Sequence, residues 1–390
     1  MKKIKKLTSL FLVISFLFTV FSLGVPAYAS GVQSSKLQAG GGASLLVSAD
    51  GTVWAWGHNG YGQLGDGTYD DKYNPIKVHK LSGVKAVAAG QGRHLLALKD
   101  DGTVWSWGYG YYGQLGNGSS GPYAYFNTPA EVSNLNNIKD IAVGVYHSLA
   151  LENNGMVWAW GRNDYGQLGD GSLANKLFPQ RSNLDRIVAV AAGEYHSLAL
   201  TFAGTVLAWG NNQYGQLGIG TNIDSRVPVV VMDGVIAIAS GGSNSLALKS
   251  DGTVWAWGRN YWGALGNGSY DDSNIPVKVK DLSGVIAIAG TTTNSLALKS
   301  DGTVWAWGYG GYDGQLGNGI TNETIPNYRS NVPVKVSNLS SVTAIALAGE
   351  YSLAMKNDGT LWSWGRNTYG QLGNGSNISS SIPVLVDFSI

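Results

Sequence analysis

The chain of 390 residues contains no cysteine. It therefore has no disulfide, no thiol nucleophile and no thiolate ligand for a metal. A lipid-anchored bacterial precursor would need a cysteine at its cleavage point, so that kind of anchor is excluded as well. Any folded unit must owe its stability to its core.

Charge is also scarce. Only 13% of the residues are Asp, Glu, Lys or Arg, whereas about a quarter is usual. The 26 basic residues barely exceed the 25 acidic ones, and nucleic-acid binding would require a basic patch or stripe. We therefore expect no nucleic-acid partner, and a surface covered largely by Gly, Ser, Asn, Thr and Tyr.

Only one long apolar run is present, and it belongs to an export signal. Four lysines within residues 2–6 precede an apolar stretch from Leu7 to about Val25, and Ala27-Tyr28-Ala29 fits the small-x-small cleavage pattern. We expect residues 1–29 to be a cleavable signal peptide, cut near Ala29, and the product to be secreted or associated with the cell surface. An uncleaved anchor is the alternative, because the run is nearly long enough to span a bilayer.

Catalytic signatures are missing too. The chain has neither a His-Glu-x-x-His nor a Gly-x-Ser-x-Gly motif. Several acids precede a glycine, as in Asp251-Gly252, which is typical of a hairpin turn. We expect a protein that is not an enzyme and has no cofactor. A glycosidase pair assembled from distant repeats stays open as an alternative.

What the chain does contain is a phrase close to Asp-Gly-Thr-Val-Trp-Ala-Trp-Gly, followed by Tyr-Gly-Gln-Leu-Gly, in seven copies. The spacing of 48 to 57 residues is typical of one supersecondary unit copied in a ring or solenoid. The glycines near the start of the phrase are Gly51, Gly102, Gly155, Gly204, Gly252, Gly302 and Gly359.

Each copy predicts four strands. In the fifth copy, residues 234–239 are a β-branched run, residues 245–249 and 253–257 alternate with period two, and Asp251-Gly252 joins them as a tight turn. A fourth strand is marked by a proline, as in residues 275–279. Because proline cannot donate to a sheet ladder, we expect it to open an outermost edge strand.

Such sheets are apolar on both faces, so neighbouring copies must cover them, and radial stacking around an axis achieves this. The chain begins with the inner part of a unit, near residues 38–47, and ends with the outer part, residues 382–386. We therefore predict an all-β, seven-bladed β-propeller of four-stranded antiparallel blades over residues 30–390. The last blade would be completed by strands from both termini.

The repeated phrase, together with Asn-x-Tyr-Gly-Gln-Leu-Gly and Ala-Gly-x-x-His-Ser-Leu-Ala-Leu, resembles the repeats of the regulator-of-chromosome-condensation family. The resemblance implies a propeller. The family's founding member acts on a small GTPase and chromatin. A secreted chain, slightly acidic once the four lysines of its signal are removed, is expected to bind neither. The Gly-Trp-Arg-His-Thr motif of the family's plant photoreceptors is absent. The context is similar to that of a secreted bacterial member that inhibits β-lactamases through one face of the ring.

Two sets of polar residues suggest metal sites. His94, His147 and His196 occupy one repeat position that elsewhere holds Ala43, Asn244, Asn294 or Tyr351. This mixture favours a side chain that hydrogen-bonds backbone within its blade. The acids of residues 66–71 and 271–272 fit a calcium loop only loosely, so we expect no metal.

The candidate binding residues come from comparing the seven copies. An aromatic column (Tyr61, Tyr112, Tyr165, Tyr214, Trp262, Tyr312, Tyr369) is held and is expected to pack mostly against the next blade. Two columns beside it vary, which favours contact with solvent or a partner, and interfaces are enriched in Tyr and Arg. From these columns we select Tyr109, Tyr111, Arg162, Asp164, Arg259, Tyr261, Tyr309 and Arg366.

Two copies carry longer loops, residues 119–127 and 320–329. Tyr123, Tyr125 and Phe126 cluster in the first and are further candidates, because loops on a rigid scaffold often carry function. An insertion that folds over the rim is the alternative.

These observations predict a secreted binding protein that uses one face of the ring against an extracellular protein. By resemblance, a β-lactamase is one candidate target. A cell-wall glycan or polysaccharide is the alternative partner, because exposed tyrosines stack on sugar rings. An enzyme acting on a polysaccharide is a third interpretation.

Overall fold

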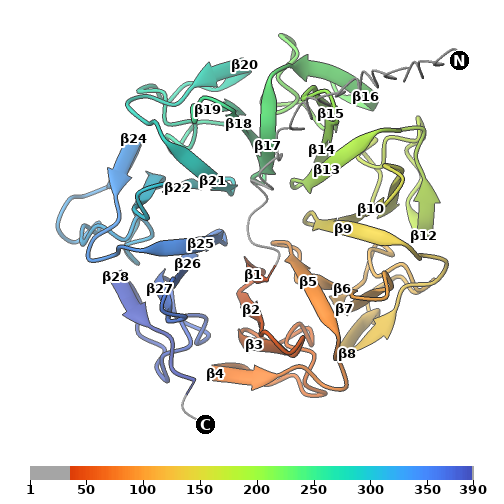
Figure 1. The fold of residues 1–390 in the computed structure, drawn as a ribbon, viewed down its shortest axis with the longest axis horizontal. Coiled ribbons are helices and arrows are strands. Elements are labelled where there is room, and N and C mark those ends of the chain that lie inside the picture. The colour runs from red at the N-terminus through yellow and green to blue at the C-terminus, as the bar shows by residue number, and fades with distance from the viewer. Residues whose placement is uncertain (1–35, 389–390) are drawn as a thin grey trace, which may run out of the picture.

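The computed structural model describes residues 36–388, which form seven four-stranded antiparallel sheets. The sheets stand as blades around a central opening (Figure 1). The predicted all-β, seven-bladed propeller is thus confirmed. The predicted signal peptide, residues 1–29, lies outside the described residues. Within residues 36–388 no helix is long and apolar enough to cross a membrane.

Every blade consists of four consecutive strands. The innermost strands are rich in Ala, Val and Ile and border the opening: β1 (Leu37–Gly40), β5 (Val84–Ala89), β9 (Ile138–Val143), β13 (Ile187–Ala192), β17 (Val235–Ser240), β21 (Val285–Gly290) and β25 (Val342–Leu347). The second strands follow: β2 (Ala43–Val47), β6 (His94–Lys99), β10 (His147–Glu152), β14 (His196–Thr201), β18 (Asn244–Lys249), β22 (Asn294–Lys299) and β26 (Tyr351–Lys356).

The third strands carry the tryptophan phrase: β3 (Val53–Gly57), β7 (Val104–Tyr109), β11 (Val157–Gly161), β15 (Val206–Gly210), β19 (Val254–Gly258), β23 (Val304–Tyr309) and β27 (Leu361–Gly365). The fourth strands form the rim: β4 (Lys72–Lys77), β8 (Tyr125–Glu131), β12 (Lys176–Arg181), β16 (Ser225–Met232), β20 (Ser273–Lys278), β24 (Arg329–Lys335) and β28 (Ser380–Leu385).

The hydrophobic core lies between blades. Each of the seven core clusters joins residues of two neighbouring blades; one, for example, packs Leu246 and Ala256 of the fifth blade against Ile288 and Trp307 of the sixth. Both faces of a blade are therefore covered, as the alternation of Val, Ala and Trp predicts. Burial of this apolar area is the main favourable contribution to folding.

The second tryptophan of each phrase also forms a polar contact between blades. Its indole Nε1 donates to a backbone carbonyl of the preceding blade, as Trp257 does to Gln216 at 2.9 Å. The same bond, between 2.8 and 3.2 Å long, occurs at Trp56, Trp107, Trp160, Trp209, Trp307 and Trp364. The second tryptophan of each repeat thus serves contacts between blades, since its buried N–H finds an acceptor in the preceding blade.

The ring closes differently from our prediction. Within residues 36–388, no blade mixes strands from both ends of the chain, because β1–β4 form the first blade and β25–β28 form the last. Closure comes from packing: Leu37 and Trp56 share a core cluster with Leu353 and Leu372. The Tyr351 hydroxyl also donates to the carbonyl of Ala43 at 2.6 Å. The predicted completion of the last blade by both termini was wrong.

The prolines of the fourth strands do not open those strands either. Pro75, for example, lies inside β4, between Lys72, which pairs with Gly57, and Ile76, which pairs with Ala55. The register shifts between these pairs, so proline occupies an irregular stretch of an edge strand. At this position the missing N–H of proline costs the sheet no ladder hydrogen bond.

Candidate functional site

The ring has two unlike faces, set by the up-and-down course of each blade. We call one the hairpin face, because it carries the Asp-Gly turns between second and third strands. In these turns the aspartate accepts from the threonine two residues on, as Asp251 does from the Thr253 N–H at 2.9 Å. The opposite face, which we call the loop face, carries the turns between first and second strands and the longer loops between third and fourth strands.

A buried asparagine organises most loops of the loop face. In the third blade, Asn163 Oδ1 accepts from the Leu168 N–H at 3.0 Å, and Nδ2 donates to the carbonyls of Ser172 and Ala174 at 3.1 and 3.2 Å. The bond to the leucine recurs at Asn59, Asn212, Asn260 and Asn367. The residues on either side of this asparagine are thereby held in place and can vary.

The second and sixth blades, which have the two long loops, lack this asparagine. Gly110 and Gly310 replace it, and their N–H groups donate to the carbonyls of Ala124 and Tyr328. The third and fourth strands consequently pair one residue further, between Tyr109 and Tyr125 and between Tyr309 and Arg329. The insertion and the loss of the asparagine therefore belong together.

Tyrosines of the first four blades meet on the loop face in a continuous series that we call the tyrosine arc. Successive rings lie 4.8 to 6.3 Å apart, centroid to centroid, which is contact distance for aromatic pairs. In order, the arc comprises Tyr61, Tyr109, Tyr111, Tyr112, Tyr146, Tyr195 and Tyr165. The held aromatic column packs against the next blade, as predicted, at Tyr61, Tyr112, Tyr165, Trp262 and Tyr369. Tyr312 departs from this expectation, since it is 71% exposed.

Arg162 lies at the middle of the arc. Its guanidinium carbon is 4.6 Å from the Tyr112 ring centroid and 5.1 Å from that of Tyr195, and its Nε donates to Asp164 Oδ2 at 2.7 Å. Burial, followed by the charge of Glu194, raises the pKa of Tyr195 to about 12. Four predicted residues, Tyr109, Tyr111, Arg162 and Asp164, are thus brought together in one charged and aromatic surface.

The other predicted residues form separate groups. On the fifth and sixth blades, Tyr261 is 57% exposed and contacts Trp262, which also contacts Tyr309. Arg259 lies 4.7 Å from the Tyr214 ring. On the seventh blade, Arg366 forms an ion pair with Glu350 at 2.6 Å.

The prediction for the loop of the second blade needs correction. Tyr125 and Phe126 are not loop residues: they begin strand β8, pair with Tyr109 and Gly108, and are half-buried. The Tyr125 ring contacts Tyr69 of the first blade. The insertion therefore folds over the rim, and only Tyr123, at 85% exposure, faces solvent fully.

Several residues of this face are missing from the sequence-based selection. Tyr146, Tyr195, Glu194, Glu350 and Arg93 all lie in the turns between first and second strands. The two variable letters of Ala-Gly-x-x-His carry the signal, since these positions also differ between copies. The fixed letters of the same phrase indicate scaffold, and the two variable positions stand between them.

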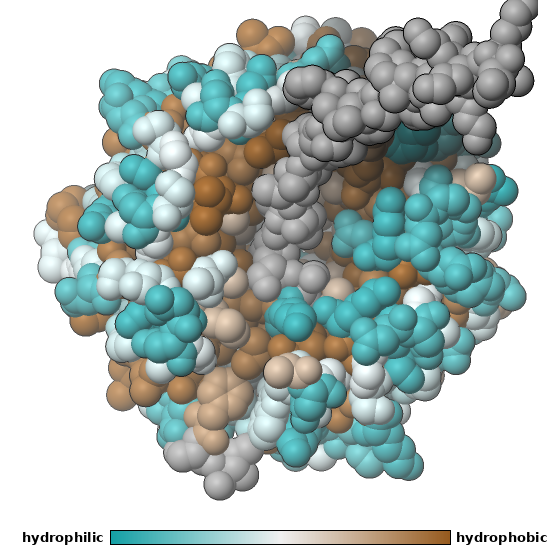
Figure 2. All heavy atoms as spheres, in the orientation of Figure 1, coloured by the Kyte–Doolittle hydropathy of each residue, from teal (hydrophilic) through white to brown (hydrophobic). Residues whose placement is uncertain are grey.

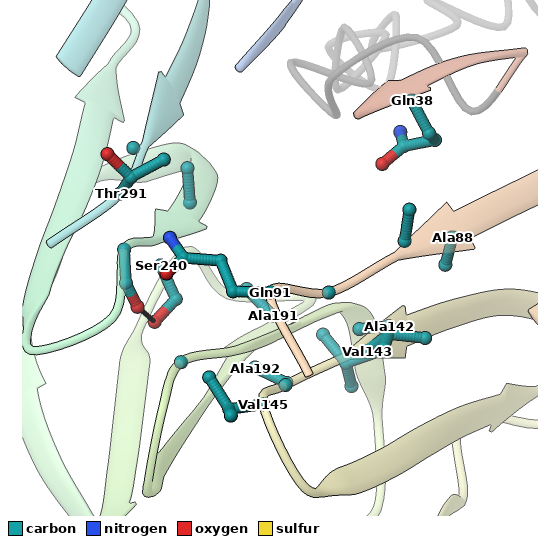
Figure 3. Close-up of a pocket in the computed structure, with 18 of the residues that line it drawn as sticks. Gln38, Ala88, Gln91, Ala142, Val143, Val145, Ala191, Ala192, Ser240 and Thr291 are labelled. Carbon is teal, nitrogen blue, oxygen red and sulfur yellow. Dashed lines mark hydrogen bonds between the residues drawn. The ribbon is translucent and has the colours of Figure 1, made fainter. Parts of the chain in front are cut away.

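The central opening is lined mostly by small side chains. In Figure 3, Ala88, Ala142, Ala191 and Ala192 border it, and Gln38, Gln91, Ser240 and Thr291 are polar groups around it. Apolar surface also gathers around the opening in Figure 2. Asp140 lies on β9 in this lining, where burial raises its pKa to about 6.

The histidine column connects blades. His94, His147 and His196 are fully buried, and each Nε2 lies 2.9 to 3.0 Å from a serine hydroxyl of the next blade. Each of these serines donates its own proton to a glutamine backbone carbonyl, as Ser197 does to Gln167. Nε2 must therefore carry the proton and donate it, and Nδ1 carries none. The histidines thus have the structural role that the sequence predicts. Their partner, however, is a side chain of the next blade and not backbone within the same blade.

This column has no ligand geometry. Burial lowers the pKa of each of the three histidines to about 3. Among residues 36–388, no group of three or more His, Cys, Asp or Glu side chains could hold a metal ion. In the acidic loops, Asp71 and Asp272 accept from the backbone N–H groups of Asn59 and Asn260, at 2.7 and 2.6 Å, and so brace the loops.

A closed ring of repeats with a rigid, variable aromatic face defines a propeller scaffold, and the comparisons give its family. The model of the RCC1-like domain matches residues 24–235. The model of the regulator of chromosome condensation (RCC1) repeat matches residues 251–298, 301–355 and 358–390. The chain belongs to the RCC1 repeat family.

Known relatives match part of the chain or its fold. The human E3 ubiquitin-protein ligase HERC2 is 39% identical over 147 residues, which are 36% of this chain and 3% of HERC2. The Arabidopsis thaliana ultraviolet-B receptor UVR8 is 33% identical over 157 residues, 39% of this chain and 34% of the receptor. The chain thus spans at most about a third of these relatives.

Solved structures match a larger share of this chain. Human WBSCR16 has a TM-score of 0.76 at 26% identity, over 87% of this chain and 95% of that protein. Yeast RCC1 (Prp20), in a complex with Kap60, has the same TM-score at 24% identity, over 88% of this chain and 85% of its own. The second likeness shows the shared fold alone.

Proposed function

We propose that this chain is a non-catalytic, secreted binding protein that holds a partner protein against its loop face. The observation that carries the proposal is the tyrosine arc with Arg162 at its centre. Tyr and Arg are the residues that dominate protein interfaces energetically, and rigid aromatic side chains lose little entropy on binding. The asparagine-braced loops would present this surface with little rearrangement.

Residues 1–29 are proposed to direct export, with cleavage near Ala29, and the propeller to occupy residues 30–390. This part rests on the basic start, the apolar run and the cleavage pattern of the sequence. The partner would then be an extracellular protein. A β-lactamase is the first target to test, by resemblance to the inhibitory member of the family.

A binding assay tests the proposal. Wild-type protein at micromolar concentration is titrated into purified β-lactamases, and in parallel is used to capture proteins from the native extracellular medium. The account expects a partner whose binding is lost in Tyr109→Ser and Arg162→Ser. It expects Phe202→Ser, an exposed residue of the hairpin face, to bind like wild type. Loss of binding in the hairpin-face variant alone would contradict the proposal.

The exposure of Tyr111, Tyr123 and Tyr261 (40, 85 and 57%) favours cell-wall glycan as a second candidate partner. Exposed aromatic rings of this kind can stack on sugars. Sedimentation with purified peptidoglycan separates the two functions. Co-pelleting that is abolished in Tyr123→Ser would support glycan binding. Wild-type protein left in the supernatant would exclude it.

A further inference from the structure

A hollow of about 370 Å³ opens on the loop face where the last blade meets the first. It arises from unequal turns. The turn between β1 and β2 has two residues, Gly41 and Gly42, whereas the turn between β5 and β6 has four, residues 90–93. The longer turn therefore reaches across the shorter one. We call this feature the seam hollow.

Glycine allows the segments that border the seam hollow to approach one another closely. A Cβ at Gly41 would lie 2.9 Å from the Cα of Arg93, and one at Gly42 would lie 3.0 Å from the Cβ of His58. Both glycines have positive φ, 59° and 82°, which side chains other than glycine rarely adopt. On the far side, the Gln91 side chain comes within 3.7 Å of a Cβ built at Gly349 of the last blade.

Arg93 supplies an uncommitted positive charge to this hollow. Its backbone φ of 66° is unusual for a residue other than glycine and is a strained conformation of the kind found at binding sites. Its guanidinium carbon lies 4.7 Å from the ring centroid of Tyr61, at one end of the tyrosine arc. Within residues 36–388 no carboxylate lies within ion-pair distance of it, whereas Arg162 and Arg366 on the same face are paired.

The remaining polar groups define the charge that fits. Gln63 Oε1 accepts from the Tyr61 N–H, so its Nε2 donates to His58 Nδ1 at 2.6 Å, and His58 keeps its proton on Nε2. Burial lowers the pKa of His58, so near neutral pH this ring is uncharged. Glu350 borders the hollow but is already bound by Arg366.

We propose that the seam hollow receives an aspartate or glutamate side chain of the partner protein, paired with Arg93, whose guanidinium lies against Tyr61 at the end of the tyrosine arc. This rests on the proposed function and adds the chemistry of one contact. Arginine pairs with a carboxylate through two parallel hydrogen bonds. A dianionic phosphate ester fits less well, because the Glu350 carboxylate lies at the border of the hollow. The neighbouring arc gives the acidic residue an aromatic flank, which a protein loop can use.

Cyclic random peptides displayed on phage provide a probe that needs no known partner. Peptides are selected on the signal-free chain and eluted with buffer. We expect the enriched peptides to carry an Asp or Glu beside an aromatic residue. Arg93→Gln should weaken a synthetic copy of such a peptide at least about tenfold. Replacing the peptide's acid by its amide should cause the same loss, and the two changes together should add little.

The control is Arg186→Gln. Arg186 resembles Arg93 in being exposed and in its positive φ of 55°, but it lies on the opposite, hairpin face. Both variants should melt like wild type, since neither side chain is in the core. Inorganic phosphate at 10 mM should not displace the peptide. Displacement would favour a phosphate site and overturn the proposal that the hollow binds a carboxylate.

The two proposals fail differently. Peptides that no longer bind the Tyr109→Ser variant but bind Arg93→Gln normally would overturn the proposed role of the seam hollow. They would leave the proposal of loop-face binding intact. Peptides that bind every loop-face variant as well as wild type would overturn both.

Discussion

Acid sensitivity of folding offers a test of how the blades are joined. His94, His147 and His196 are fully buried, and each donates from Nε2 to a serine of the next blade. Their Nδ1 atoms are buried without a hydrogen-bond partner. A proton on Nδ1 would therefore place a buried charge on an atom that has no hydrogen-bond partner.

The magnitude follows from the pKa values. Each histidine has a pKa of about 3 in the folded protein and about 6.5 when unfolded. Between these values only the unfolded chain takes up the proton, so acid lowers stability. The loss begins as pH falls through about 6.5 and is complete near pH 3. At about 1.4 kcal/mol for each pH unit, one histidine costs about 2 kcal/mol at pH 5, and three cost about 6 kcal/mol.

The matching variant replaces all three by asparagine, which the ring itself uses at Asn244 and Asn294. The free energy of unfolding is measured in urea at pH 7 and pH 5. Wild type should lose about 6 kcal/mol more than the triple variant over this interval. Asp140, with a raised pKa of about 6, acts in the opposite direction, because folding favours its protonated form. It is common to both proteins and cancels.

Single replacements should each remove about a third of the difference. An equal pH dependence in wild type and triple variant would refute the buried, neutral histidines. Titration of the imidazoles by NMR gives an independent reading, since they should stay uncharged in the folded protein at pH 5.

Two further predictions concern the scaffold. Trp56→Phe and Trp257→Phe each remove one indole bond to a neighbouring blade and should destabilise equally, by about 1–2 kcal/mol in urea unfolding; a negligible effect at Trp56, at the seam, would contradict ring closure by packing. Asn163→Ala leaves the Leu168 N–H and two carbonyls of the third loop without their partners and should cost about 2–4 kcal/mol. It should also weaken partner binding through Arg162, and unchanged stability would show that the loop is held by other contacts.

The fold was predictable because the repeat fixes local structure and leaves each blade apolar on both faces. Trp257 and Gly218 illustrate why the letters are held: the indole bonds to the preceding blade, and a Cβ at Gly218 would meet that ring at 2.8 Å. Ring closure was harder, because the contacts of Trp56 with Gln371 join residues at opposite ends of the chain. The sequence carries no local sign of which strands share the last blade.

The candidate site was only partly predictable. Arg162 and Tyr109 were found because they vary on a constant frame. The role of Arg93 could not be predicted in this way. It depends on a difference in length between two turns of neighbouring blades, and only the folded ring places those turns side by side. Tyr125 was misplaced, because an inserted loop and an extended strand look alike in sequence when the pairing partner is unknown.

The central claim is that the loop face binds a partner protein, and quantitative affinity capture tests it most directly. Equal amounts of wild type, the Tyr109→Ser/Arg162→Ser double variant and Phe202→Ser, each checked for an unchanged melting temperature, are exposed to the native extracellular medium. Bound proteins are then quantified by mass spectrometry. The account predicts one protein held alike by wild type and Phe202→Ser, and reduced at least about a hundredfold on the double variant. A protein held equally by all three, or lost only from Phe202→Ser, would contradict it.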